Sequence, residues 1–364
     1  MASKSPKNIL ITGATGFIGG TILTTLLASD SPALQAATIT CLVRGADRAT
    51  TLTSAYGSRV RTIIYKGLDD VEATEAAASQ ADVVIGATLG FHPASAQALL
   101  RGLAKRRAAA QGKTDIWMIH LSGASNLSDQ PITGAYLEDR TFDDVEDDVY
   151  GYEKHREGLR HYPQRATELG VIDSGLELGV RTVVMMPPTI YGVGTGLFNR
   201  TSIQIPTYIR AVLELGHGVV IGDGAGEINH VHVEDLAELY RLVVLDILDN
   251  GGSRLPAGKK GILFSSHGIH SWMDVARGIA EACQRAGKIE DAQVRSVGLE
   301  DAGTYLKSYM DLVGGDLVEL ELGLCSNSRT RTSVARQLGW RPTRGEEAWK
   351  KCFEEDLRAV LCSS

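Results

Sequence analysis

Four side chains in the first half of the chain have the types and spacing to move a proton at a carbonyl or alcohol oxygen. Tyr150 and Lys154 are four residues apart, so on a helix they share one face. A lysine cation beside a phenol favours the phenolate and so lowers the pKa of the tyrosine toward a working value. Tyr150 can then donate or accept the proton, while a hydroxyl from Ser122 or Ser125 holds the same oxygen. Such a pair is also common on surface helices, so the prediction depends on the elements around it.

A glycine-rich turn near the N-terminus is the first of those elements. An apolar strand at residues 8–11 leads into glycines at three-residue intervals, and an apolar helix follows. This spacing permits a tight turn, close approach of the backbone to a pyrophosphate, and free N–H groups at the start of the helix. The turn therefore predicts a dinucleotide site. Its expected residues are Gly13, Thr15, Gly16, Phe17, Ile18 and Gly19.

Apolar segments typical of strands recur through the first half, with helix-like stretches between them. They lie at residues 8–11, 38–43, 60–65, 82–87, 115–121 and 181–186. The alternation predicts an α/β fold, a Rossmann-type doubly wound parallel sheet. Glycines then punctuate the chain, which indicates a smaller substrate-binding lobe, and a strand at 262–265 returns to the sheet. We expect the cofactor domain at residues 1–190 and about 230–266, and the lobe at about 191–229 and 267–364.

The end of the second strand indicates which dinucleotide binds. An NAD site normally places Asp or Glu there to bond the ribose 2′-hydroxyl, whereas this chain has Arg44, with Arg48 one helical turn further on. A guanidinium matches the charge and geometry of a 2′-phosphate, so NADP(H) is favoured over NAD(H). By the same topology Leu68 and Asp69 border the adenine. Ala87 and Thr88 line the route to the nicotinamide.

Composition excludes several classes of partner. The net charge is −7 and the pI is near 5.8, so the chain has no basic footprint for nucleic acid or an acidic membrane surface. No apolar run approaches the roughly 18 residues of a membrane span. The five cysteines are scattered without metal-type spacing, and no metal site is predicted. We expect a cytoplasmic protein whose partner is a small molecule.

Taken together, these segments resemble the extended short-chain dehydrogenase/reductase family, which contains sugar-nucleotide epimerases, dehydratases and dihydroflavonol-type reductases. The resemblance runs nearly end to end and includes PPTIYG at 187–192, VHVEDLA at 231–237 and LGWRP at 338–342. It implies a nicotinamide cofactor in contact with Pro187. It also implies Tyr150 as acid and base, with Lys154 bonding the nicotinamide ribose.

Two departures from the family pattern concern the catalytic hydroxyl and the substrate class. The family's catalytic Ser or Thr aligns with Gly123, which leaves Ser122 and Ser125 as the neighbours that supply a hydroxyl. Nucleotide-sugar enzymes often carry an Arg shortly before the segment at 231–237 to grip the diphosphate, and this chain has none there. A nucleotide-sugar substrate is therefore disfavoured.

A third departure concerns the spacing after the tyrosine. Tyr150 and Thr182 in the sixth strand are 32 positions apart, more than one crossover helix requires, and Pro163 interrupts them. An added helical piece absorbs the surplus. Such a piece offers an oligomer contact, so a homodimer is among our expectations.

These observations lead to an oxidoreductase hypothesis. The chain is expected to interconvert a carbonyl and an alcohol on a small organic substrate, using NADP(H) and acid–base chemistry at Tyr150 and Lys154. Two alternatives stay open: an epimerase, isomerase or dehydratase that retains its nicotinamide cofactor, and a non-catalytic NADP(H)-sensing or scaffold protein. The substrate contacts we expect are His92, Tyr191, Phe198 and Asn199.

Overall fold

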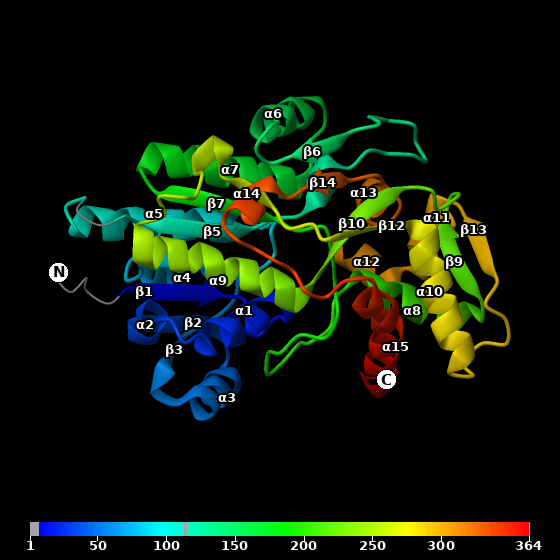
Figure 1. Cartoon of the computed structure of the whole chain (residues 1–364), viewed down its shortest axis with the longest axis horizontal. Coiled ribbons are helices and arrows are strands. Elements are labelled where there is room, and N and C mark those ends of the chain that lie inside the picture. The colour runs from blue at the N-terminus through cyan, green and yellow to red at the C-terminus, as the bar shows by residue number, and fades with distance from the viewer. Residues whose placement is uncertain (1–6, 113–114, 364) are drawn as a thin grey trace.

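A parallel sheet of seven strands forms the centre of the protein (Figure 1). The computed structural model describes residues 7–112 and 115–363. Across the sheet the strand order is β11-β7-β5-β4-β1-β2-β3. The strands are β1 Asn8–Thr12, β2 Thr38–Arg44, β3 Val60–Tyr65, β4 Val83–Gly86, β5 Trp117–Leu121, β7 Arg181–Met186 and β11 Ile262–Phe264. Each coincides with a predicted strand, and the predicted Rossmann-type α/β fold is confirmed.

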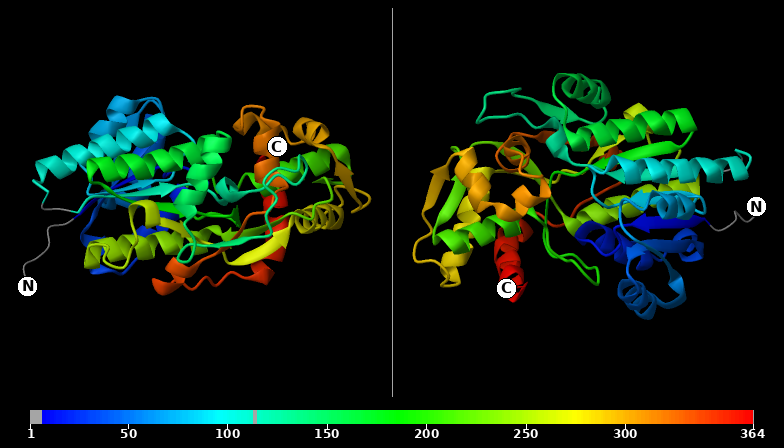
Figure 2. Two further views of the ribbon diagram at one scale, coloured as in Figure 1. Left: turned by 90° about the horizontal axis from the view of Figure 1, so that it is seen from above. Right: turned by 180° about the vertical axis from the view of Figure 1, so that it is seen from behind.

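Helices cover both faces of this sheet because its strands are apolar on both sides. In β1, Ile9 and Ile11 pack into one core and Leu10 packs into another, as the two-residue period of a strand requires. The first face carries α1 Phe17–Leu27, α2 Pro32–Ala36, α3 Ala46–Tyr56 and α9 Val233–Asn250; the second carries α4 Val71–Ala78, α5 Pro93–Ala109 and α7 Pro163–Leu178. The view from above in Figure 2 shows the sheet on edge, with α5 (cyan) on one side and α9 (yellow-green) on the other.

Two helices, not one, connect β5 to β7. The first, α6 Val149–Leu159, lies against α7 and the short helix η3 Gly258–Lys260, at the β11 edge of the sheet. The second, α7, starts at Pro163, a residue suited to the first turn of a helix, and runs along the sheet to β7. The surplus of residues noted in the sequence is thus an additional helix, α6, outside the crossover itself.

A second core lies beyond the carboxyl ends of the strands, at the right of Figure 1. Its helices are α8 Gln204–Leu215, α10 Trp272–Arg285, α11 Leu299–Tyr305, α12 Lys307–Leu312, α13 Leu317–Leu324 and α15 Glu346–Ser363. Its strand pair is β9 Gly218–Ile221 and β13 Val294–Val297, and a three-stranded sheet of β8 Thr189–Tyr191, β10 Glu227–His232 and β12 Gly268–Ser271 stands between the two cores.

One part of the C-terminal third departs from the expected division. Strand β14 Arg329–Arg331 pairs with β6 Thr141–Asp143, and α14 Ser333–Gln337 packs on β11. Trp340 follows, fully buried in the first core, with its indole N–H donating to the carbonyl of Asp235 at 2.8 Å. Residues 329–340 therefore belong to the sheet-containing half, although the sequence places them in the substrate lobe.

A buried carboxylate fastens the second core to the loop after β5. Glu321 of α13 accepts bonds from the backbone N–H groups of Ile132 at 2.7 Å and Thr133 at 2.9 Å, and from the Thr133 hydroxyl at 2.9 Å. Its side chain is fully buried. This clamp sets the position of α13, which forms one wall of the cavity described below.

Replacing Glu321 by glutamine is expected to lower the free energy of unfolding by about 2 kcal/mol, because an amide NH₂ would face N–H donors that now bond a carboxylate. Thermal unfolding followed by circular dichroism measures the change. Glu300→Gln, at an exposed position on α11, is the matched control and should stay within about 0.5 kcal/mol of the wild type. Equal melting temperatures for the two variants would contradict the clamp.

Across the described ranges, 7–112 and 115–363, no helix combines the length and the apolarity needed to cross a membrane.

Candidate functional site

A cavity of about 620 Å³ runs along the carboxyl ends of the central strands, between the two cores. One end is formed by the glycine turn, the other by the loop after β5 and by α12 and α13. Open α/β sheets bind ligands at this edge. Residues from the cofactor and catalytic predictions that line it are Gly13, Thr15, Gly16, Phe17, Ile18, Arg44, Arg48, Leu68, Ala87, Thr88, Ser122, Ser125 and Pro187.

The glycine turn has the geometry of an anion cradle. Gly13 has φ +75°, and a Cβ there would lie 2.2 Å from the carbonyl oxygen of Ala87, so only glycine fits. Gly19 does not line the cavity but lies directly beneath the turn, where a Cβ would be 2.3 Å from the carbonyl oxygen of Gly13. Helix α1 starts at Phe17 with no side-chain cap, which leaves its first N–H groups free for a phosphate.

Two arginines give this end of the cavity its charge. Arg44 ends β2, and Arg48 lies in the first turn of α3. Burial raises the pKa of the nearby Tyr65, and both guanidinium groups oppose this rise. Of the described residues that line the cavity, these two arginines are the only charged ones. No carboxylate in that lining takes the place that would bond a ribose 2′-hydroxyl.

A loop from the second half closes over the glycine turn. Gly196 approaches Gly20 of α1 so closely that a Cβ on it would lie 2.9 Å from the Gly20 Cα. The N–H of Thr195 donates to the Thr21 hydroxyl at 3.2 Å, and the N–H of Asn199 donates to the Thr15 carbonyl at 3.4 Å. Asn199 lines the cavity as expected, whereas Phe198 is half-buried against the first core and does not. Figure 1 shows this green loop reaching α1.

Three other predicted ligand contacts have structural partners elsewhere. His92 is the N-cap of α5: its Nδ1 accepts from the Ser95 N–H, and its Nε2 lies 3.2 Å from Asp69. Neither His92 nor Asp69 lines the cavity. Tyr191 is fully buried in the second core, and its hydroxyl donates to the Arg344 carbonyl at 2.8 Å. The structure thus gives His92, Asp69 and Tyr191 partners within the fold and does not bring them to the cavity.

Tyr150 and Lys154 also lie outside the cavity. The Tyr150 hydroxyl donates to Asp173 at 2.6 Å, and the Lys154 ammonium pairs with the same carboxylate at 2.9 Å. Asp173 is ten residues along α7 from Pro163, about 15 Å at the rise of an α-helix. The Asp173 bond and burial raise the pKa of Tyr150, and Lys154 opposes this shift as expected without reversing it. The structure places the pair at the edge of the sheet, because α6 carries it there.

A different tyrosine reaches the loop after β5. The hydroxyl of Tyr162, the residue before α7, lies 3.0 Å from the Ser125 hydroxyl. Gln164, in the first turn of α7, donates from its amide to Ser125 Oγ at 3.1 Å and to the Gly123 carbonyl at 3.0 Å, and it lines the cavity. The sequence interpretation missed both residues. Counting back one ordinary crossover helix from β7 would have pointed to Tyr162.

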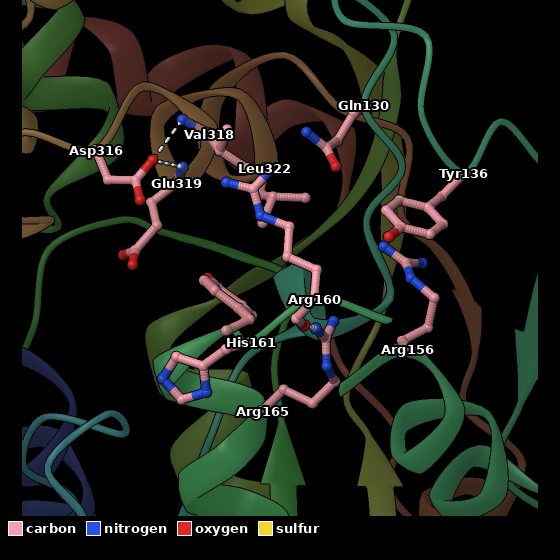
Figure 3. Close-up of a pocket in the computed structure, with 11 residues that line it drawn as sticks. Gln130, Tyr136, Arg156, Arg160, His161, Arg165, Asp316, Val318, Glu319 and Leu322 are labelled. Carbon is pink, nitrogen blue, oxygen red and sulfur yellow. Dashed lines mark hydrogen bonds between the residues drawn. The ribbon is translucent and has the colours of Figure 1, made fainter. Parts of the chain in front are cut away.

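Tyr162 also lines a smaller hollow beside α13. Figure 3 shows the arginines that surround this hollow. Arg156 and Arg165, both 3% exposed, come from α6 and α7, and the Arg156 guanidinium lies 4.0 Å above the Tyr136 ring. The volume, about 20 Å³, holds about one water molecule. The hollow has no room for a substrate, and its arginines anchor the α6–α7 junction: Arg165 pairs with Glu157 at 3.1 Å.

Behind the other serine lies a chain of buried polar groups. Asn126, fully buried, donates from one amide nitrogen to Ser122 Oγ at 3.2 Å and to Glu168 of α7 at 2.7 Å. Burial raises the pKa of Glu168 to about 7, although bonds from Ser122 and Asn126 oppose the shift. Burial and the neighbouring Glu168 carboxyl raise the pKa of Glu153 of α6 as well. Glu168 is therefore linked to the cavity wall through one side chain, Asn126, and Glu153 adjoins Glu168.

Comparison with known proteins gives matches along the chain. The family model described as "Male sterility protein" matches residues 11–100, and that of the NAD dependent epimerase/dehydratase family matches residues 161–253. The protein called "Oxidase ucsJ" from Acremonium sp is 30% identical over 347 residues, which cover 92% of this chain and 93% of that protein.

Solved structures share the fold over almost the whole chain. The PbgP3 protein from Burkholderia pseudomallei has a TM-score of 0.62 and 13% identity, with 98% of each chain covered. The dTDP-glucose 4,6-dehydratase DesIV from Streptomyces venezuelae, with NAD and TYD bound, has a TM-score of 0.61 and 15% identity and covers 98% of this chain and 97% of its own. At these identities the likeness concerns the fold alone.

Proposed function

Because the chain belongs to the extended short-chain dehydrogenase/reductase family, which includes the NAD-dependent epimerases and dehydratases, we propose that it is an NADP(H)-dependent oxidoreductase. Its substrate would be a small organic carbonyl compound or alcohol. The observation that carries the proposal is one continuous cavity with arginines at the nucleotide end and hydroxyl groups at the other.

The nucleotide end fits a dinucleotide that carries an additional phosphate. The glycine turn and the uncapped start of α1 suit the pyrophosphate, and Arg44 and Arg48 suit the 2′-phosphate. A carboxylate would repel that phosphate, and none is present among the described lining residues. When bound, the nicotinamide supplies or removes a hydride.

The opposite end supports an uncharged substrate. Its described lining includes apolar residues such as Phe91, Leu312 and Ile228, and it holds no side chain that is charged at neutral pH. The polar groups facing the cavity there include Ser122, Ser125 and Gln164, which can hold a carbonyl or hydroxyl oxygen by hydrogen bonds. A nucleotide sugar would find no cation for its diphosphate at this end, in line with the missing Arg before residue 231.

Fluorescence titration of the purified protein with NADPH and NADH tests the cofactor. We expect NADPH to bind at least about tenfold more tightly, the effect of one added charge-assisted contact of about 1.5 kcal/mol or more. Incubation with NADPH and a panel of apolar aldehydes and ketones, followed at the nicotinamide absorbance, tests the reaction. Equal affinities would contradict the NADP(H) preference. A tightly retained nicotinamide with no net change in absorbance would contradict net oxidoreduction.

A further inference from the structure

The buried carboxyl groups of Glu153 and Glu168 are only partly satisfied by hydrogen bonds from the described residues. Both side chains are fully buried where α6 packs on α7. An isolated ionised carboxylate at such a place costs several kcal/mol, so natural cores hold few of them without partners. Glu153 comes from α6 and Glu168 from α7.

The hydrogen-bond partners of the two groups favour a protonated pair. Neither oxygen of Glu153 has a donor among the described residues, and one oxygen of Glu168 also has none. The neighbouring groups that act on the pKa of Glu153 are the Glu168 carboxyl, which raises it, and Asn126 and Arg165, which lower it. Two carboxyl oxygens attract each other only when one of them carries a proton, as in the carboxylate pairs of acid proteases. The pair therefore holds at least one proton.

The surrounding charges do not remove that proton. The cation facing the pair is Arg165, which is already paired with Glu157 at 3.1 Å. Its neighbour Arg156 bonds to the Ser128 carbonyl and the Tyr152 hydroxyl. With one guanidinium between three carboxyl groups, full ionisation of both buried glutamates is disfavoured.

The pair is connected to the cavity through a single layer of side chains. Asn126 donates to Ser122 and to Glu168 from the same nitrogen, so these two acceptors lie side by side. Ser122 is also among the groups that lower the pKa of Glu168, as expected of a hydroxyl that approaches the carboxyl group. Ser122 lines the cavity, so its oxygen can meet a substrate oxygen on one side while its hydrogen faces Glu168 on the other.

The nearby tyrosine does not offer an alternative base. Burial raises the pKa of Tyr162 to about 12. The position four residues on, where a lysine would favour the phenolate, is Ala166. At neutral pH the phenol keeps its proton and acts only as a hydrogen-bonding group toward Ser125.

We propose that Glu153 and Glu168 are the proton store of the oxidoreduction, and that Ser122 carries the proton between this pair and the substrate oxygen. The inference rests on the function proposed above. In alcohol oxidation the substrate O–H bond breaks and its proton joins Ser122 Oγ, while the Ser122 proton moves to Glu168. The substrate C–H bond breaks with its electron pair, which goes as hydride to the oxidised nicotinamide dinucleotide. The pair starts with one proton and ends with two; carbonyl reduction is the reverse.

Infrared difference spectroscopy across a pH titration tests the store without cofactor or substrate. We expect the wild type to show a protonated buried carboxyl at neutral pH and a second one that titrates near pH 7. Glu153→Gln should remove the carboxyl that stays protonated, and Glu168→Gln should remove this titration. Asp173→Asn, a carboxyl-to-amide change on the same helix outside the network, should keep it. Two ionised glutamates at pH 7, or a titration that survives in Glu168→Gln, would overturn the proposal.

The relay itself is tested by pH profiles of the NADPH-dependent reduction identified with the carbonyl panel. Reduction consumes a proton, so kcat should fall as the pH rises through about 7, where Glu168 loses its proton. Glu168→Gln should lower kcat about a hundredfold, flatten this profile and leave the NADPH affinity unchanged; Asp173→Asn should keep the wild-type profile. A wild-type profile in Glu168→Gln would overturn the relay. A wild type that binds NADPH but reduces nothing would count against the proposed function, while the infrared result still decides whether the pair holds a proton.

Discussion

Replacing Arg44 and Arg48 together by alanine is expected to weaken NADPH binding by at least about a hundredfold. Each guanidinium can make charge-assisted bonds to the 2′-phosphate, and such bonds contribute about 1.5–3 kcal/mol each. Both side chains border the cavity, and no described carboxylate in its lining competes for them. Fluorescence titration of the variant with NADPH measures the loss.

The same titration with NADH provides the internal control, because NADH lacks the phosphate and should lose less than about threefold in affinity. Arg61→Ala, at an exposed position on β3 outside the cavity, is the control variant and should bind both dinucleotides like the wild type. An equal loss for NADPH and NADH in the double variant would show that the arginines hold the fold of the turn and not a phosphate.

Removing the hydroxyl groups of Ser122 and Ser125 together should lower kcat at least about a hundredfold with little change in NADPH affinity. These hydroxyls line the end of the cavity remote from the arginines, where they can hold a substrate oxygen and pass on its proton. Steady-state kinetics of the double alanine variant with the carbonyl substrate found in the panel measures the effect.

Tyr150→Phe is the informative contrast, since the sequence pattern predicts a loss of the same size for it. In the structure its hydroxyl bonds Asp173 at the edge of the sheet, so kcat should stay within about twofold of the wild type. A hundredfold loss in Tyr150→Phe, with normal turnover in the double serine variant, would return the chemistry to the tyrosine and lysine of α6.

The sheet and the nucleotide end of the site could be predicted because their signals are local. A strand that is buried on both faces appears in the sequence as a short run of apolar residues, and the segments of β1, β2 and β4 consist mostly of such residues. The glycine turn needs its residues at fixed positions, and Gly13 has no space for any side chain. The position of Arg44 beside the turn could be predicted as well, because Arg44 is the last residue of the neighbouring strand β2.

The acid–base residues could not be predicted in the same way, because their positions depend on how the chain reaches β7. An i, i+4 spacing places Tyr150 and Lys154 on one face of a helix but does not say which helix lies over the nicotinamide end. The additional helix α6 holds the pair at the edge, and α7 brings Tyr162 and Gln164 to the site. In the sequence, only the large number of residues between the fifth and sixth predicted strands indicated this arrangement.

Other errors arose where a polar side chain serves the fold. His92 follows the fourth strand of the sequence, as a ligand contact would, yet it caps α5. Tyr191 lies in the family-like segment, yet its ring meets the Trp349 ring in the second core at a centroid distance of 5.0 Å. The burial of Glu153 and Glu168 could not be predicted, since glutamate is rarely fully buried and nothing in a single sequence shows that two helices will bury these two side chains.

Because residues 329–340 pack on the sheet-containing half, the C-terminal third of the chain contributes to both halves of the molecule. Trp340 fills the nucleotide-binding half from a point only a few residues before the last helix begins. A fragment that ended after β11 would lack the Trp340 indole and strand β14, which pairs with β6. The surfaces that these residues now cover would then be exposed to water. The nucleotide-binding half is therefore not a detachable module, and the lobe that shapes the substrate end cannot be exchanged by a single splice.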